Sequence, residues 1–315
     1  MINFRFHLVS LIAVFLALGL GILVGSTVVD QVIVDRLDRE IRTARRDTAT
    51  VQAENRRLSD EVARGDEHAR RSSGYVLQGR LRGVPVIVIA ETGVDSAIPR
   101  TIVSALRDAG ATTPGVVWLE GGWRLDGDAD LAALQRVSGT AGNNATVRTA
   151  ALAALAARLS APRATASTAD PDVLGALRDE GFVRFGEGDA SAFTAFPQRS
   201  PRVVLVTGTD TKLGGTDALA DLSRAFVGRG ASVTAVDAYD DHGGTTPLPE
   251  RGAAVAPVRG DRTLSARVST VDDPDHPAGV VATVLTVADP GTVGHYGFGT
   301  GARALLPEAP TRTSP

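Results

Sequence analysis

The chain contains no cysteine, and its single methionine is Met1. Disulfides, thiolate metal sites and cysteine nucleophiles are therefore excluded, while the redox compartment stays open. Lysine occurs only at position 212, so arginine carries almost all of the positive charge. Aromatic residues make up 4% of the chain, and the formal net charge is −3. A balance so close to neutral gives no general attraction to nucleic acid, and we expect no nucleic-acid partner.

Familiar catalytic and nucleotide-binding signatures are also missing. No Gly-x-Ser-x-Gly, His-Glu-x-x-His or Gly-x-Gly-x-x-Gly stretch occurs. The nearest approach to a phosphate-binding loop is "TGTDTKLGGTDAL" at 207–219. There Lys212 follows Gly208 after only three residues and is followed by Leu213, which is the wrong register for a Walker loop. We therefore predict a protein that is not an enzyme, with no catalytic and no cofactor-binding residues.

A long apolar run stands near the N-terminus. Residues 8–29 are 22 residues without a charged side chain, enough to span a hydrocarbon core of about 30 Å. A short tail, residues 1–7, precedes the run and carries Arg5. The run is longer than the apolar core of a usual signal peptide, so we interpret it as an uncleaved transmembrane signal anchor. Cleavage near residues 25 and 26, where small side chains cluster, is the alternative.

Two rules disagree about the side of the membrane on which the rest of the chain lies. Arg36, Arg39 and Arg42 follow the span and outnumber Arg5, so the positive-inside rule favours the cytoplasm. A tail of seven residues is instead typical of a signal anchor, and long domains cross the membrane largely regardless of charge. We predict a single-pass cell-membrane protein whose C-terminal body is extracytoplasmic, in the envelope.

Small residues recur every four positions within the predicted span. Such a stripe lets two membrane helices approach closely, so it is the predicted packing surface in the membrane. The general frequency of glycine and alanine in membrane helices explains the pattern equally well. The residues concerned are Ala13, Ala17, Gly21 and Gly25.

The charged stretch at 31–71 predicts a coiled-coil stalk. Positions at alternating steps of three and four residues are mostly apolar or small, which is the a/d pattern of a heptad repeat. A lone solvated helix is the alternative, but it would not need this repeat. Asn55 falls at an a position, where a buried amide fixes register, and Glu40 at g would meet Arg45 at e of a parallel partner. The partner is either a second copy, giving a homodimer, or a helix of another protein. We call the predicted interface the seam; it comprises Val34, Leu37, Ile41, Ala44, Thr48, Val51, Asn55, Leu58 and Val62.

Three further segments follow the stalk. The triplet Ser72-Ser73-Gly74 predicts the end of the helix and a hinge over residues 72–83. An α/β domain follows over residues 84–305. The last stretch, 306–315, is predicted to be a disordered tail.

The α/β domain shows two similar units. Short β-branched runs at 84–90 and 202–208 are typical of strands buried on both faces. Each run leads into a helix that ends at a glycine, Gly110 or Gly230, and then into another strand. We predict an α/β fold with an N-terminal transmembrane helix, a coiled-coil stalk and a Rossmann-like body built from two βαβ units.

Carboxylates accompany a histidine in "DAYDDH" (237–242) and in "VDDPDHPAG" (271–279). Oxygen and imidazole donors of this kind suit a hard or borderline divalent metal. The same residues are ordinary in turns and helix caps, which is the interpretation that we favour. The candidate metal ligands are Asp240, Asp241, His242, Asp272, Asp273, Asp275, His276 and His295.

Three stretches, at 6–26, 268–289 and 294–307, resemble a known family. They are similar to the actinobacterial copper transport protein B family, called MctB in mycobacteria, and the resemblance covers the order of the whole chain. Its most specific features are Ser269-Thr270-Val271-Asp272-Asp273 with Gly279, and Gly294-His295-Tyr296-Gly297. The chain also resembles SteB, a corynebacterial cell-separation protein.

These resemblances imply two different roles. The first implies copper homeostasis or efflux. We predict no cofactor, and only the family resemblance leaves room for a bound copper ion. The second implies a non-enzymatic adaptor that works with a membrane partner, SteA, upstream of the control of peptidoglycan hydrolysis. Copper(I) favours cysteine and methionine, which the chain almost wholly lacks, and one membrane helix with parallel-type strands does not build a pore. We therefore expect the chain to act by assembly through its span and stalk.

Overall fold

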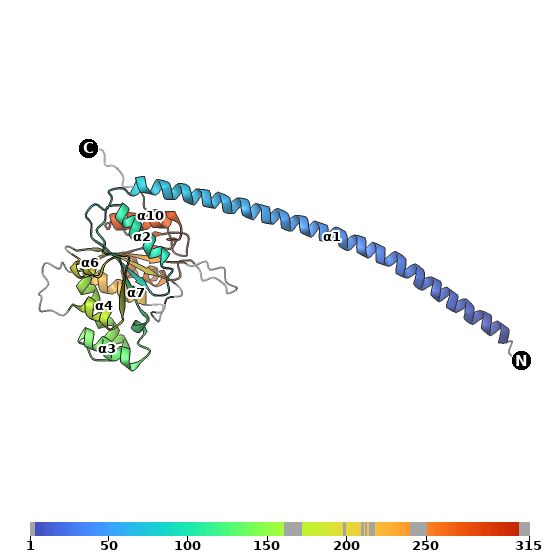
Figure 1. The fold of residues 1–315 in the computed structure, drawn as a ribbon, viewed down its shortest axis with the longest axis horizontal. Coiled ribbons are helices and arrows are strands. Elements are labelled where there is room, and N and C mark those ends of the chain that lie inside the picture. Colours follow the sequence, from blue (N-terminus) through green and yellow to red (C-terminus); the bar gives the residue numbers. More distant parts are fainter. Residues whose placement is uncertain are drawn as a thin grey trace. The chain divides into compact units, whose positions relative to one another are not determined.

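The computed structural model describes residues 4–160, 172–197, 200–208, 211, 213, 218–239 and 251–308, with position 4 and residues 26–35 described by their backbone alone. The chain divides into two compact units, residues 1–65 and 66–315. One helix, α1 (Phe4–Leu77), makes up the described part of the first unit and gives its last turns to the second (Figure 1).

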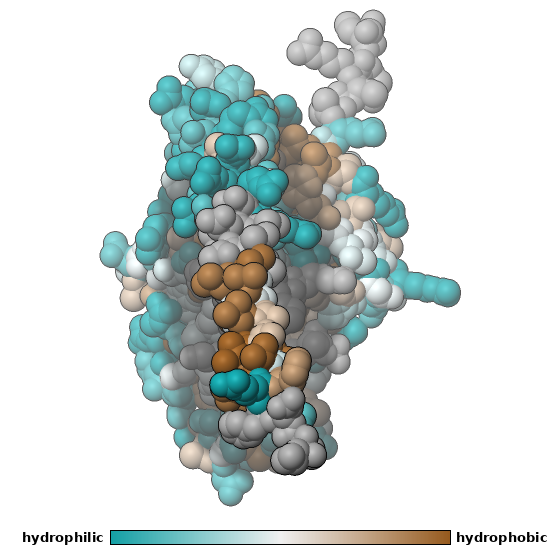
Figure 2. Space-filling model, turned by 90° about the vertical axis from the view of Figure 1, so that its right-hand side faces the viewer, coloured by the Kyte–Doolittle hydropathy of each residue, from teal (hydrophilic) through white to brown (hydrophobic). Residues whose placement is uncertain are grey.

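The N-terminal part of α1 is a candidate membrane span. Residues Arg5–Gly25 form a stretch of 21 residues that is long and apolar enough to cross a bilayer. Its side chains are exposed, and Figure 2 shows the brown, hydrophobic side chains gathered at this end of the helix. An apolar surface of this extent is unfavourable in water and favourable in lipid. A helical apolar segment is therefore confirmed at the place where the sequence predicts the membrane anchor.

The helix does not break where the Ser-Ser-Gly triplet predicts, and that expectation is wrong. α1 continues through Ser72, Ser73 and Gly74 and ends at Leu77. Both serine hydroxyls donate to carbonyls of the preceding turn, Ser72 Oγ to His68 O at 2.5 Å and Ser73 Oγ to Arg70 O at 2.7 Å. Back-bonding of this kind satisfies the hydroxyls within the helix, so both serines are compatible with a helical backbone. Leu77 is buried in the second unit, and its packing offsets the roughly 1 kcal/mol that a helical glycine costs.

The second unit is built on a seven-stranded sheet in the order β3-β2-β1-β4-β5-β6-β7. Neighbouring strands are parallel except for β2 and β3, which are antiparallel. The carboxyl ends of the parallel strands meet at one edge of the sheet, where ligand sites of α/β folds usually lie. The strands are β1 (Val86–Glu91), β2 (Val116–Leu119), β3 (Val183–Gly186), β4 (Arg202–Thr207), β5 (Ser232–Asp237), β6 (Val268–Val271) and β7 (His295–Tyr296).

Helices cover both faces of this sheet (Figure 1). Successive β1 residues face opposite sides, so Val86 and Val88 belong to one buried core, and Ile87 and Ile89 to the other. Helices α2 (Ala97–Asp108) and α10 (Pro277–Ala288) cover the first core. The opposite core lies under α3 (Asp128–Ser138), α4 (Asn144–Ser160), α5 (Val173–Asp179), α6 (Ala190–Ala195), α7 (Ala218–Gly228), α8 (Ala256–Gly260) and α9 (Arg262–Ser265), with the 3-10 helix η1 (Gly121–Arg124) after β2.

The two predicted βαβ units are both present, and they share one sheet. They are β1-α2-β2 and β4-α7-β5, and β1 pairs directly with β4. Gly110 and Gly230 follow their helices with φ of 93° and 75°, the left-handed conformation predicted for a helix C-terminus. The antiparallel β3 distinguishes this sheet from a wholly parallel one. The predicted order of an N-terminal apolar helix followed in the sequence by an α/β unit with a largely parallel sheet is thus confirmed.

Candidate functional site

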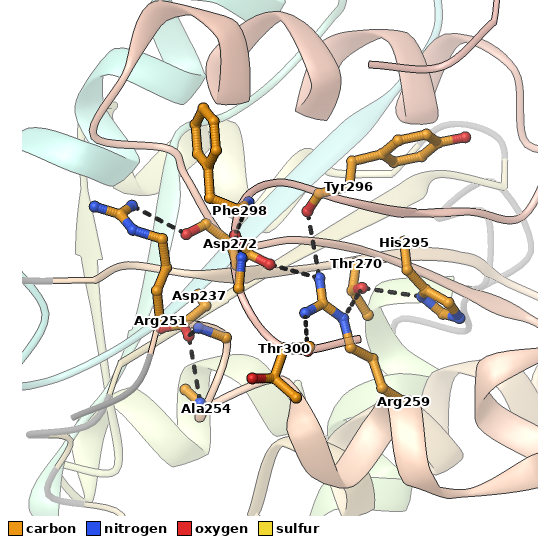
Figure 3. A network of polar contacts seen from close by, with 12 residues as sticks. Asp237, Arg251, Ala254, Arg259, Thr270, Asp272, His295, Tyr296, Phe298 and Thr300 are labelled. Carbon is orange, nitrogen blue, oxygen red and sulfur yellow. Dashed lines mark hydrogen bonds and ion pairs between the residues drawn. The ribbon is translucent and has the colours of Figure 1, made fainter. Parts of the chain in front are cut away.

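Residues far apart in the sequence meet where β5, β6 and β7 end. Asp237 closes β5, Asp272 follows β6, and the glycine-rich stretch 297–301 follows β7. Two segments singled out in the sequence, 269–273 and 294–297, therefore lie side by side (Figure 3). The parallel pairing of β6 with β7 aligns Thr270 with His295. This juxtaposition is the candidate functional site of the second unit.

A buried ion pair forms its centre. Arg259 Nη2, carried by α8, lies 2.8 Å from Asp272 Oδ2, and the two side chains are 6% and 0% exposed. The other carboxylate oxygen, Oδ1, accepts hydrogen bonds from the backbone N–H groups of Phe298 at 2.8 Å and Gly299 at 2.9 Å. A carboxylate so far from water needs these partners, because an uncompensated buried charge is strongly unfavourable.

The guanidinium of Arg259 donates hydrogen bonds to four residues, including the carbonyl of Tyr296 at 3.3 Å (Figure 3). Nε donates to Thr270 Oγ1 at 2.8 Å, and Nη1 donates to the carbonyl of Thr300 at 2.7 Å. Thr270 Oγ1 also lies 3.0 Å from Nδ1 of His295, whose pKa is lowered by burial and by the positive charge of Arg259. We call Arg259, Thr270, Asp272, His295, Tyr296 and Thr300 the Arg259 network. It fastens the C-terminal glycine-rich stretch to the sheet.

Two glycines in this stretch are required by close contacts. Gly297 has a φ of 125°, which favours glycine, and a Cβ there would overlap the carboxylate of Asp272. A Cβ at Gly299 would overlap the carbonyl of Arg251. The glycines let the backbone approach near enough for the N–H groups to reach Asp272. Their recurrence in the sequence therefore has a structural reason.

A second buried carboxylate holds the segment that leads into α8. Oδ2 of Asp237 accepts hydrogen bonds from the backbone N–H groups of Gly252 at 2.9 Å and Ala254 at 3.3 Å. Its Oδ1 has no hydrogen-bond partner among the described residues. Burial, reinforced by the charge of Asp272, raises the pKa of Asp237 to about 6. Burial likewise raises the pKa of Glu91, at the end of β1, to about 7. Hydrogen bonds with Thr211 and Thr207 act in the opposite direction and lower this pKa.

Asp273 lies next to the N-terminus of α10 and is fully buried. Neither of its carboxylate oxygens finds a hydrogen-bond partner among the described residues. Burial and then the charges of Asp272 and Asp275 raise the pKa of Asp273 to about 6, although Arg251 and His276 oppose this. A Cβ at Gly279 would overlap the backbone carbonyl of Asp273, so glycine is required there too.

The buried charge of Asp273 predicts a dependence of stability on pH. Its folded pKa of about 6 lies above the ordinary value of 3.8, so the folded state holds the proton more tightly. The tighter binding of this proton stabilises the folded state. This stabilisation is complete below about pH 4 and is lost as the pH rises through about 6. We expect Asp273→Asn to raise the free energy of unfolding at pH 7 by roughly 1 to 3 kcal/mol. Urea unfolding at pH 7 and pH 4 measures this, and an equal gain at both pH values would contradict it.

The structure separates the predicted metal candidates. Asp272 and His295 join the Arg259 network, in which a guanidinium already stands opposite the carboxylate. Asp275 pairs with Arg251 through both oxygens, at 2.7 and 3.0 Å, and His276 Nδ1 lies 3.4 Å from Asp66. Within the described ranges, no group of three or more potential metal ligands occurs. Asp240, Asp241 and His242 lie outside the described residues.

Sequence reasoning missed the arginines that organise this region. Arg259 and Arg251 stand in unremarkable stretches, and no local spacing connects them with Asp272 or Asp275. Arg251 also lies over the ring of Tyr239, with its guanidinium carbon 4.2 Å from the ring centroid. Only the crossing of the chain from β5 through α8 to β6 brings these side chains together.

The seam is exposed on α1. In the first unit Leu37, Ile41, Val51, Leu58 and Val62 are between 41% and 58% exposed. Thr48 Oγ1 donates to the carbonyl of Ala44 at 2.8 Å, so its hydroxyl is satisfied within the helix. Charged neighbours pair along the helix, for example Arg36 with Glu40. The side chain of Val34 lies outside the described residues. These positions stay the predicted partner interface.

The small-residue stripe likewise lies on exposed helix. Added side-chain atoms at Gly21 or Gly25 would meet nothing within 4 Å, so both backbones are open to an approaching helix. Ala13 and Ala17 are exposed as well. Membrane packing through this stripe stays a prediction.

Comparison with known proteins gives a consistent result. The family model described as copper transport outer membrane protein, MctB, matches residues 1–307. Proteins named copper transporter MctB from Mycobacterium bovis and Mycobacterium tuberculosis are 26% identical to the chain over 327 residues. That alignment covers 97% of this chain and 99% of each relative. Because the family model extends over nearly the whole sequence, the chain belongs to the MctB family.

Proposed function

We propose that this protein is a single-pass, membrane-anchored envelope protein that supports copper homeostasis or efflux by assembling with a partner chain. In this proposal the chain is not a pore by itself. The family description and the names of the relatives supply the copper role. The helix over Arg5–Gly25 supplies the anchor, and we place the second unit outside the cytoplasmic membrane.

The exposed seam is the observation that carries the proposal. Between Arg36 and Gly74, each Leu, Ile and Val falls at an a or d position of one heptad repeat. Apolar side chains aligned in this way are unfavourable in water and are normally covered by a second helix. A stalk that served only as a spacer would have no need of this alignment.

The chemistry of the chain favours assembly over direct coordination of copper. Copper(I) is held best by thiolates and thioethers, and this chain has no cysteine and only Met1. Two buried carboxylates of the candidate site already have structural tasks, since Asp272 pairs with Arg259 and Asp237 accepts hydrogen bonds from backbone N–H groups. In this proposal copper is the cargo of the assembly, and this chain does not bind it directly.

A deletion and complementation experiment tests the proposal. We expect loss of the gene to lower the copper concentration that the host tolerates, and the wild-type gene to restore it. The double variant Val51→Glu and Leu58→Glu places charges on the seam and should fail to restore tolerance. Ala53→Glu, at an f position on the outer face, is the matched control and should restore it. Growth across a copper series, with zinc and nickel series for specificity, is the measurement.

Two outcomes would contradict the proposal. Unchanged copper tolerance after deletion would remove the copper role. Chained, unseparated cells at ordinary copper would instead favour the cell-separation adaptor, which works with a membrane partner to control peptidoglycan hydrolysis. Full complementation by the seam variant would show that assembly through the stalk is not required.

A further inference from the structure

We infer that the seam binds a second copy of this chain, so that two stalks pair in parallel and in register. The inference rests on the proposed function, because it names the partner that the seam binds. The observations that carry it are a hollow on the seam, the placement of charges beside that hollow, and the anchor at one end of α1.

The hollow lies where the seam side chains are small. A depression of about 330 Å³ is lined by Ile41, Ala44, Arg45, Thr48, Ala49 and Gln52. The first four occupy successive a, d, e and a positions. Four residues in this arrangement form the hole that receives a side chain from the facing helix of a coiled coil. In a parallel, in-register pair that side chain is Ala44 of the second copy, and small residues on both helices let the backbones approach closely.

The charges beside the hollow are complementary between two copies. Glu40 stands at a g position, and Arg45 stands five residues later at an e position. In a parallel pair, g and e positions at this spacing face each other across the interface, so two symmetric Glu40–Arg45 pairs would flank the Ala44 layer. The side chain of Arg45 forms no hydrogen bond or ion pair with the described residues. Glu40 is 62% exposed and pairs with Arg36 of its own helix at 3.1 Å, so Arg45 of a second copy would share its carboxylate. The next g and e residues are Asp47 and Gln52, which do not repel. Glu61 and Asp66, at the far end of the stalk, would oppose each other, so the pair is held more loosely there.

The anchor fixes the relative direction of the two helices. Both copies carry the candidate span at the same end of α1, so two copies in one membrane with the same orientation have parallel stalks. Asn55 at an a position then faces Asn55 of the second copy only when the register is exact to the residue. Direction and register are therefore both specified.

Cross-linking of the full-length chain in membranes tests the inference. The absence of native cysteine makes each introduced thiol unique. Ala44→Cys lies on the seam at d, and Ala53→Cys lies on the outer face at f, so the same substitution is compared at two positions. Outer-face residues of a helix pair are roughly 20 Å apart, beyond the reach of a short bis-maleimide. We expect Ala44→Cys to yield a covalent dimer at least about fivefold more efficiently than Ala53→Cys.

A charge exchange gives an independent measurement. Glu40→Arg should lower the dimer yield of the Ala44→Cys chain about three- to tenfold, because four arginines then surround the layer. Adding Arg45→Glu should restore the yield. Equal cross-linking of the seam and outer-face variants, or no rescue by the exchange, would overturn the second-copy inference. If the seam variant still lost copper tolerance in that case, the proposed function would stand with a different partner chain.

Discussion

Replacing Arg259 by methionine is expected to lower the free energy of unfolding of the second unit by about 3 to 5 kcal/mol. Methionine keeps an unbranched apolar side chain of about the length of the aliphatic part of arginine, but it lacks the guanidinium and its charge. Asp272 would then be a fully buried carboxylate without its ion-pair partner. The hydrogen bonds to Thr270 and to the carbonyl of Thr300 would be lost as well. Broken buried pairs of this kind are among the most destabilising single changes.

Urea unfolding of the full-length protein in detergent measures this effect. Both tryptophans of the chain, Trp118 and Trp123, lie in the second unit, so their fluorescence reports its unfolding. Arg136→Met is the matched control, because Arg136 forms an exposed pair with Glu180 whose loss should cost less than about 1 kcal/mol. Equal losses in the two variants would contradict a central role for the Arg259 network.

A companion double variant separates the two causes of the loss. Arg259→Met combined with Asp272→Leu removes the orphan carboxylate together with the guanidinium. We expect this chain to unfold at a higher urea concentration than Arg259→Met alone, because replacement of a whole buried pair by apolar side chains is often tolerated. The backbone N–H groups of Phe298 and Gly299 would still lose their acceptor, so recovery should be partial.

Gly297→Ala is the second substitution with a large expected effect, a loss of about 3 kcal/mol or more. The φ of 125° is unfavourable for alanine, and the new methyl group would overlap the Asp272 carboxylate. The turn would have to move, which would separate the N–H groups of Phe298 and Gly299 from Oδ1. The same fluorescence-detected urea unfolding measures the loss.

Gly260→Ala provides the matched control for this change. Gly260 is the last residue of α8, where an added Cβ meets nothing within 4 Å. We expect it to change stability by less than about 0.5 kcal/mol, or to stabilise slightly by restricting the unfolded chain. The prediction would be contradicted if Gly297→Ala changed the free energy of unfolding as little as Gly260→Ala does. The glycine-rich stretch could then move away from Asp272 without loss of stability.

The elements that were predictable from the sequence are those with local signals. Continuous β-branched runs marked β1 and β4, and glycines marked the ends of α2 and α7, because burial and left-handed caps each act within a few residues. The Ser-Ser-Gly triplet gave a wrong helix end, because the burial of Leu77 depends on packing against distant segments, which no local pattern reveals. No local pattern in the sequence predicted that β3 would run antiparallel to β2.

The candidate site was predictable only in part, for a related physical reason. Asp272, Asp273 and His295 are predictable as candidate site residues because they lie in short stretches rich in polar side chains. Nothing local indicates which cation a buried carboxylate will meet, since this depends on how distant segments cross. The structure supplies an arginine from α8, and this turns a candidate metal ligand into half of an ion pair.

The Arg259 network also has a consequence for the order in which the protein is made. The N–H groups that complete the shell of Asp272 belong to residues 298 and 299, and Arg303 N donates to the carbonyl of His295 at 2.8 Å. The ribosome must therefore reach residue 303 before these contacts can form. The apolar segment at the other end emerges first and can meet a membrane while the sheet still lacks its last strand. The apolar segment can therefore enter a membrane before the hydrogen bonds that complete the Arg259 network have formed.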